Sequence, residues 1–178
     1  MTYAKQKLSV KTQALAAIGA VAAAVILPQI FHLMGAISGT GTALGETFLP
    51  MHLPIILAGL LAGPYVGAAS GLLAPLFSFA LTGMPNAAML PFMMIELCVY
   101  GLTSGLLLNV KMPTFAKVVV AQVAGRGVRA IAILLAVYAF ESNAISVAVI
   151  WNSVAAGVFG IALQWAFIPL IVYRVKNR

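Results

Sequence analysis

Residues 116–140 read AKVVVAQVAGRGVRAIAILLAVYAF, an apolar run of membrane-spanning length that carries Arg126 and Arg129 near its middle. A helix that crosses a bilayer needs about 20 mainly apolar residues, and this run provides them. The rest of the chain has the same character, because 63% of its 178 residues are hydrophobic and 7% are charged. Soluble domains carry about a quarter of charged residues. The composition therefore predicts that most of the chain lies in lipid.

Six apolar runs predict six membrane-spanning helices, at about 12–34, 48–62, 65–82, 87–108, 115–140 and 145–173. The alternation at every second residue that marks a membrane β-barrel is absent, and unpaired strands cannot lie in lipid. We therefore predict an all-α integral membrane protein, with a single six-helix membrane domain over residues 1–178. The segment GAISGTGTALGE, residues 35–46, is expected to be a loop after the first span.

The positions of the cations predict the orientation of the chain. Eight of the ten Lys and Arg residues flank predicted spans, namely Lys5, Lys7, Lys11, Lys111, Lys117, Arg174, Lys176 and Arg178. They fall at the two termini and around the loop between the fourth and fifth spans. Short basic loops stay in the cytoplasm, so both termini are predicted to be cytoplasmic. Because the net charge of +7 is distributed in this way, we do not expect nucleic-acid binding.

The charges inside the spans indicate the first candidate site. An Arg at the centre of a span costs about 2.5–3.5 kcal/mol on insertion scales, so Arg126 and Arg129 need compensation. Glu96 is the acid that falls inside a predicted span. Counting about 1.5 Å per residue along antiparallel spans places Glu96 at the depth of Arg129. Such a pair either only locks two helices together or presents donors to a ligand, and two Arg against one Glu leave a surplus cation.

Polar and aromatic side chains in the outer half of the predicted bundle form the second candidate group: His52, Met84, Asn86, Tyr100, Trp151 and Asn152. Each by itself is compatible with ordinary packing, since Trp and Tyr are enriched at membrane interfaces. Together with Glu96 and Arg129 they would line a pocket of small-molecule size, with aromatic faces and a few polar groups.

Small residues repeat along the first span. In ALAAIGAVAAAVI, residues 14–26, Ala16, Ala20 and Ala24 recur at every fourth position. Small residues let membrane helices approach closely. The stripe is therefore either an internal packing face or a docking face for the helices of a partner.

The sequence favours neither a metal site nor a catalytic site. Two His and one Cys have no recognised ligand spacing. The chain lacks Asp, so a Ser/His/Asp set is not possible. We expect a protein that is not an enzyme and that holds no cofactor of its own.

The chain resembles the substrate-binding S component of an energy-coupling factor (ECF) transporter. The resemblance rests on its length, its six predicted spans, the alanine stripe of the first span, and the segment LPMHLPIILAGLLAGPYVGAASGLLAPLFSFALTGMP, residues 49–85. It covers nearly the whole chain.

The resemblance implies a subunit of an ATP-driven importer in a prokaryotic plasma membrane. Such a subunit captures a vitamin from outside and delivers it through a T subunit and two ATPase subunits, which use ATP and Mg. The alanine stripe would contact the T subunit. The ligand would lie in the outer half, covered by residues 38–45 and 82–86. A hydroxymethylpyrimidine or a pyridoxine-like ring is the first expectation for the ligand, and pantothenate is the second.

Two other functions remain open at this stage. A small oligomeric transporter that works without partners would need its own ion-coupling acid, and Glu96 is the candidate inside a span. A structural membrane protein without a ligand would use Glu96 only for stability. An intramembrane enzyme is disfavoured by the absence of a catalytic set.

Overall fold

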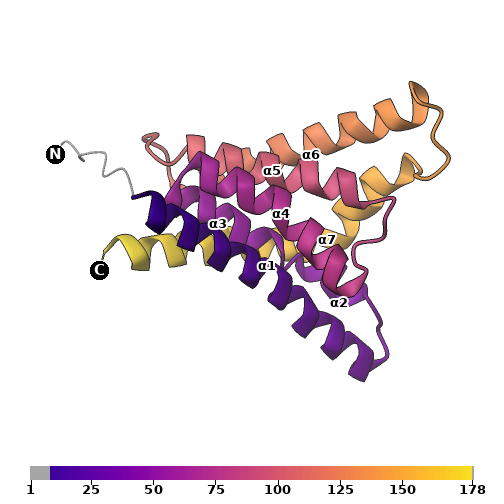
Figure 1. Ribbon diagram of the computed structural model, residues 1–178, viewed down its shortest axis with the longest axis horizontal. Coiled ribbons are helices and arrows are strands. Elements are labelled where there is room, and N and C mark those ends of the chain that lie inside the picture. Colours follow the sequence, from indigo (N-terminus) through magenta and orange to yellow (C-terminus); the bar gives the residue numbers. More distant parts are fainter. Residues whose placement is uncertain (1–8, 178) are drawn as a thin grey trace.

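The computed structural model describes residues 9–177, and over this range the chain is all-helical, with seven helices and no strand. They are α1 (Val10–Ser38), α2 (Ala43–Phe48), α3 (His52–Ala62), α4 (Pro64–Thr82), α5 (Leu90–Leu106), α6 (Thr114–Tyr138) and α7 (Ala148–Lys176) (Figure 1). Among these residues, five segments are long and apolar enough to cross a membrane: α1, α2 with α3, α4, α6 and α7. Helix α5 is a shorter apolar helix of 17 residues. The prediction of an all-α, multi-pass membrane protein is confirmed.

The segment 35–46, expected to be a loop, is mostly helical. Helix α1 continues to Ser38, and α2 begins at Ala43. The break between them is short because Gly39 has a left-handed backbone (φ 74°) and its N–H bonds back to the carbonyl oxygen of Gly35. Glycine makes this conformation inexpensive at the end of a helix. The glycines therefore end one helix and do not unwind the whole segment.

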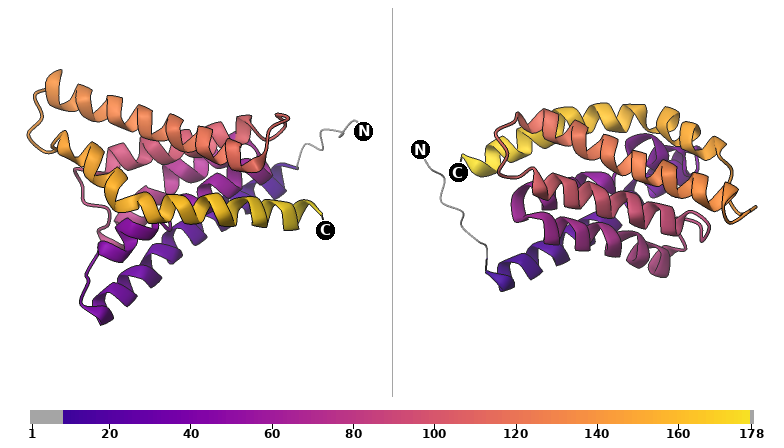
Figure 2. Two further views of the ribbon diagram at one scale, coloured as in Figure 1. Left: turned by 180° about the vertical axis from the view of Figure 1, so that it is seen from behind. Right: turned by 90° about the horizontal axis from the view of Figure 1, so that it is seen from above.

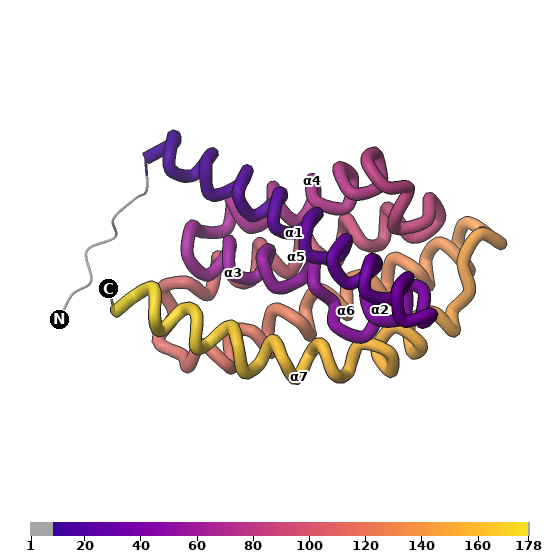
Figure 3. Tube along the Cα trace, turned by 90° about the horizontal axis from the view of Figure 1, so that it is seen from below, coloured from indigo at the N-terminus to yellow at the C-terminus, as the bar shows by residue number. Residues whose placement is uncertain are grey.

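The long helices run along one bundle. The first turn of α1 and the last turn of α7 lie at the same end, and the connection from α6 to α7 lies at the opposite end (Figures 1 and 2). Viewed from below, α3 lies between α1 and α7 and contacts both (Figure 3). The short α2 packs against α1 and α7 at the end opposite the termini.

Helices α3, α4 and α5 approach one another through glycines. A Cβ atom on Gly59 of α3 would lie 2.7 Å from the Cβ of Ser104 on α5. Gly67 of α4 and Gly101 of α5 face each other so closely that a Cβ on either would overlap the backbone of the other. Small residues permit such backbone contact between membrane helices. The van der Waals packing that results drives helix association in lipid.

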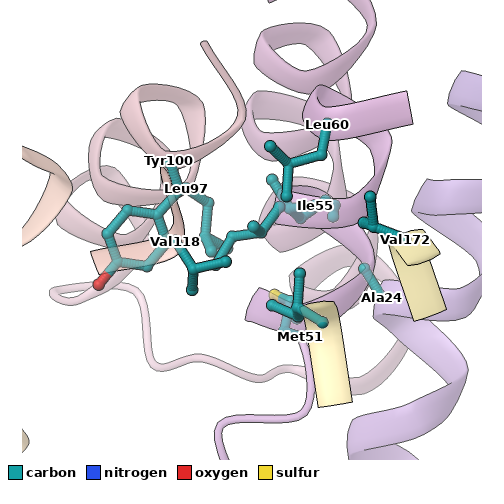
Figure 4. Packing of buried hydrophobic residues seen from close by; sticks show 11 residues of the cluster. Ala24, Met51, Ile55, Leu60, Leu97, Tyr100, Val118 and Val172 are labelled. Atoms are coloured by element: carbon teal, nitrogen blue, oxygen red, sulfur yellow. The ribbon is translucent and has the colours of Figure 1, made fainter. Parts of the chain in front are cut away.

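The structure corrects the expected docking role of Ala24 in the alanine stripe. It is fully buried in the core, with Ile55, Leu97 and Val172 among the other members of the cluster (Figure 4). Ala20 and Ala16, one and two turns earlier, are half-buried. The face that carries the stripe therefore turns toward the bundle, because α1 packs on α3 and α4. Ala24 serves internal packing in this structure, while Ala16 and Ala20 border the open face of the helix.

Candidate functional site

A cavity of about 450 Å³ lies at the end of the bundle opposite the termini. Its volume falls in the range of sites for small molecules, about 300–1,000 Å³. Six of the predicted residues line it: His52, Met84, Asn86, Glu96, Arg129 and Asn152. Parts of all seven helices form its walls, together with the segments between α2 and α3 and between α4 and α5. The fold thus gathers side chains that are far apart in the sequence.

A buried ion pair forms part of the wall. Arg129 Nη1 donates to Glu96 Oε2 at 2.8 Å, and the Tyr100 hydroxyl donates to Glu96 Oε1 at 3.0 Å. Glu96 is 1% exposed and Arg129 is 7% exposed. Both oxygens of the carboxylate are therefore bonded by the protein, and the pairing expected from helix depth is present. A ligand would meet a neutral, preorganised pair and not a free carboxylate.

Tyr100 supports the site from behind and does not line it. Its side chain is buried, and its position four residues after Glu96 places the two side chains on the same face of α5. The ring packs beside His52, with 5.3 Å between ring centroids, and it occupies space that a Cβ on Gly125 would need. Contrary to the expectation, Tyr100 is not among the residues that line the cavity. Its contacts make it a positioning residue for Glu96 and His52.

Trp151 and Arg126 also lie outside the cavity. Trp151 is 73% exposed, because adjacent residues of a helix point about 100° apart and its neighbour Asn152 takes the cavity side. Arg126 extends toward α7, where its Nη1 lies 3.5 Å from the carbonyl oxygen of Ser153. A Cβ on Gly157 would lie 3.3 Å from Arg126 Nη2. The surplus cation expected in the site therefore faces the contact between α6 and α7.

Two imidazoles line the cavity. His52 is buried and His32, on α1, is half-buried. The Nδ1 atoms of both have no hydrogen-bond partner among the described residues. Buried polar groups are normally bonded, so these ring nitrogens, on two residues of the cavity wall, lack a partner that the described residues do not provide. The sequence reasoning missed His32, although a polar ring one turn after Pro28 in an apolar span was a usable signal.

Other cavity residues were also missed because the segments that carry them were read as loops or as plain packing. Glu46 lies on α2 and borders the cavity, with its Oε1 accepting from Thr42 Oγ1 at 3.3 Å. Met51, Met89 and Met93 join Met84 in the lining. Methionine side chains are flexible and polarisable, so they adapt to ring-shaped ligands and contact aromatic edges favourably.

Helix α2 closes one side of the cavity and is seated on α7. The Phe48 ring lies between Phe31 and Phe159, with centroid distances of 4.9 and 5.3 Å. Gly160 on α7 leaves room for the backbone of α2, since a Cβ there would lie 2.6 Å from the carbonyl of Phe48. The position of the C-terminal end of α2 therefore depends on the space that Gly160 leaves on α7.

A buried amide network holds the turn after α2. Gln164 Nε2 donates to the Leu49 carbonyl oxygen at 3.3 Å, and Gln164 Oε1 accepts from Gln122 Nε2 at 2.8 Å. Trp165 Nε1 donates to Gln122 Oε1 at 2.6 Å. Leu49 lines the cavity and has a left-handed backbone. The network thus links the cavity wall to α6 and α7.

Replacing Gly160 by valine is expected to unseat α2 from α7. The added Cβ would overlap the backbone carbonyl of Phe48, and this carbonyl can move only if the whole turn after α2 moves with it. Overpacking of this kind costs about 1–3 kcal/mol. We expect cleavage of residues 39–48 by a protease to become faster while the midpoint of global unfolding changes less. The matched control is Ala155→Val on an exposed position of α7. Equal cleavage rates for the two variants would refute the seating role of Gly160.

Comparison with protein families identifies the chain. A family model described as ECF transporter, substrate-specific component, matches residues 10–174. Comparison with curated proteins and with solved structures gave no match. The matched range includes all of α1 to α6, most of α7 and every residue of the cavity. The chain therefore belongs to the family of substrate-specific components of ECF transporters.

Proposed function

We propose that this S component captures a small, neutral, ring-containing vitamin from outside the cell and binds it in the cavity of about 450 Å³. The observation that carries the proposal is a site of vitamin size whose walls combine a neutralised ion pair with two imidazoles. Delivery across the membrane would require a T subunit and two ATPase subunits, which would use ATP and Mg. The chain itself would carry no cofactor and perform no catalysis.

The proposed orientation places the cavity toward the exterior of a prokaryotic cell. Lys and Arg are concentrated at the two ends of the chain, as in Lys11 and Arg174, and the cavity lies at the other end of the bundle. Basic flanks favour the cytoplasmic side, so both termini would be cytoplasmic. The T subunit would contact α1 along its open face, with Ala16 and Ala20 at the edge of that contact.

The charge of the cavity disfavours an anionic ligand. Glu46, Glu96 and Arg129 are its ionisable acidic and guanidinium groups among the described residues, and Glu96 and Arg129 neutralise each other. Because Arg126 does not line the cavity, a carboxylate such as that of pantothenate would find no free cation there. A hydroxymethylpyrimidine or a pyridoxine-like ring would instead use hydrogen bonds to Asn152 and to the imidazoles, with methionine contacts to the ring.

The test is to identify the molecule that the protein carries. The chain would be purified from cells grown in rich medium and analysed by native mass spectrometry, followed by calorimetric titration with a panel of B vitamins. We expect a bound mass that matches a neutral ring vitamin. A protein that stays empty across the panel would refute the proposal. Tighter binding of pantothenate than of the ring compounds would refute the proposed substrate class.

Replacing Asn152 by alanine is expected to weaken ligand binding about tenfold. A hydrogen bond contributes a net of about 0.5–1.5 kcal/mol, and about 1.4 kcal/mol, near the top of that range, corresponds to a factor of ten. Calorimetric affinities would be compared with those of Asn109→Ala, an exposed control between α5 and α6. Trp151→Phe, next to the tested position but outside the cavity, is expected to keep the affinity of the unchanged protein. Equal losses in Asn152→Ala and Trp151→Phe would contradict the assignment.

A further inference from the structure

The mid-membrane charges of α5 and α6 do not balance. Glu96 carries one negative charge, and both of its oxygens are bonded by Arg129 and Tyr100. Arg126 is close enough to Glu96 for the two charges to interact. One positive charge is nevertheless left over in the cluster of Glu96, Arg126 and Arg129. An unbalanced guanidinium in the hydrocarbon region is unfavourable, and such groups mark functional sites by default.

A second, small pocket lies beside the surplus charge. It has a volume of about 40 Å³, is lined by Arg126, Arg129 and Ser153, and is completed by apolar side chains, Ala130, Ile133, Ile150 and Val154. Arg129 borders both this pocket and the larger cavity. The pocket therefore lies between α6 and α7, and it shares Arg129 and Ser153 with the wall of the larger cavity.

Donors at this pocket are left without partners. Arg129 is nine-tenths buried, and its Nε has no hydrogen-bond partner among the described residues. The Nε of Arg126 is likewise buried and unpaired, and its Nη1 makes a 3.5 Å contact at the limit of hydrogen bonding. The Ser153 hydroxyl is already used, because it donates to the Ile150 carbonyl oxygen at 3.1 Å. Buried N–H groups without a partner are unfavourable, and these two belong to the guanidinium groups whose side chains line the pocket.

We propose that the pocket between α6 and α7 binds a small monovalent anion of the size of chloride, held by Arg126 and Arg129. The anion would neutralise the surplus charge of the Glu96, Arg126 and Arg129 cluster. The apolar walls strengthen its attraction to the guanidinium groups, since they lower the local dielectric constant. The proposal goes beyond vitamin binding, because the anion would be a resident component of the empty protein.

The volume limits which anion fits. One water needs about 10–15 Å³ of such space, so about 40 Å³ accommodates a single small ion with little water. Gluconate and a vitamin are too large, and sulfate carries two negative charges against one surplus positive charge. Arg126 lies 12 residues before the end of α6, about 18 Å deep along the helix. At that depth a lipid phosphate would have to leave the headgroup layer, so a free ion is the favoured occupant.

The experiment measures how anions affect the unfolding of the ligand-free protein in nanodiscs of phosphatidylcholine. Tryptophan fluorescence would report the unfolding temperature while chloride replaces gluconate at constant ionic strength and pH. A ligand that binds only the folded state raises this temperature in a saturable way. We expect such a rise with chloride and with bromide, and none with sulfate. Identical unfolding curves in chloride and gluconate would overturn the proposal.

Two variants test the location of the anion. Arg126→Gln removes the surplus charge and is expected to weaken the chloride response at least tenfold, whereas the exposed cytoplasmic-flank control Arg174→Gln should retain it. Ala130→Leu fills the pocket without removing a charge, and it should also remove the response, so the test stands even if Arg126→Gln does not fold. A chloride response that survives in Ala130→Leu would overturn the assignment.

A change of lipid distinguishes whether a free ion or a lipid headgroup supplies the negative charge. The same measurements would be repeated in nanodiscs containing phosphatidylglycerol. Stabilisation by the anionic lipid alone, without any effect of chloride, would overturn the proposal of a free ion in favour of a headgroup phosphate. Vitamin binding is not needed in any of these measurements, so their failure would leave the proposed function intact.

Discussion

Replacing Glu96 by alanine is expected to destabilise the fold by about 3–5 kcal/mol and to abolish ligand binding. This is the cost typical of removing one partner of a buried ion pair, because the other charge is left uncompensated. Arg129 would be that charge, and it is 7% exposed. The Tyr100 hydroxyl would lose its acceptor at the same time. The change therefore affects both the stability of the α5–α6 contact and the cavity wall.

The measurement combines unfolding in denaturant with calorimetric titration of the identified vitamin. Replacing both partners, as in Glu96→Leu with Arg129→Met, is the matched control. Apolar pairs of similar volume often replace buried ion pairs at little cost or with a gain in stability. We expect the double variant to fold nearly as well as the unchanged protein and still to bind no vitamin. Full binding by the double variant would mean that the pair only locks α5 to α6.

Replacing Gly101 by leucine is expected to prevent the packing of α4 on α5. A Cβ at this position would overlap the backbone of Gly67, and a leucine would add three further carbon atoms to the overlap. Overpacking of an ordinary core costs about 1–3 kcal/mol, and here backbone, not a flexible side chain, blocks the space. We therefore expect a larger cost and a protein that is mostly misfolded at ordinary temperature.

Gly127→Leu is the matched control for this prediction. It also adds a side chain to a glycine within a long helix, but nothing lies within 4 Å of the new Cβ. Removing a glycine from a helix interior is worth about 0.5–1 kcal/mol, so this variant should be as stable as the unchanged protein or slightly more stable. Size-exclusion profiles and unfolding midpoints would separate the two variants. Equal elution profiles and unfolding midpoints for the two variants would show that α4 and α5 can move apart without loss of the fold.

The membrane character and the family could be predicted from the sequence because both depend on long segments. Hydropathy summed over about 20 residues changes little with the identity of any one residue. The pairing of Glu96 with Arg129 was also predictable, since an acid and a base inside apolar spans are costly unless they meet. Helix rise then brings the two residues to the same depth. These inferences needed composition and length but no knowledge of helix rotation.

The short helix α2 was missed for a local reason. Glycine and threonine in residues 35–46 are typical of loops. Yet one residue with a left-handed backbone, Gly39, is enough to end α1 before the chain becomes helical again. The packing of Phe48 against Phe31 and Phe159 then stabilises a helix that its own residues favour only weakly. Tertiary contacts therefore override local propensity at this place, as they often do.

The sequence by itself determined that this chain is a helical membrane protein of the S-component family with one charge pair inside the bilayer. Tertiary structure alone decided which side of each helix faces inward. It placed Ala24 in the core, His32 at the cavity, and Arg126 against α7 and away from the cavity. A soluble helix reveals its buried side by one apolar stripe. A membrane helix is apolar toward lipid and toward its neighbours alike, so its rotation is set only by packing.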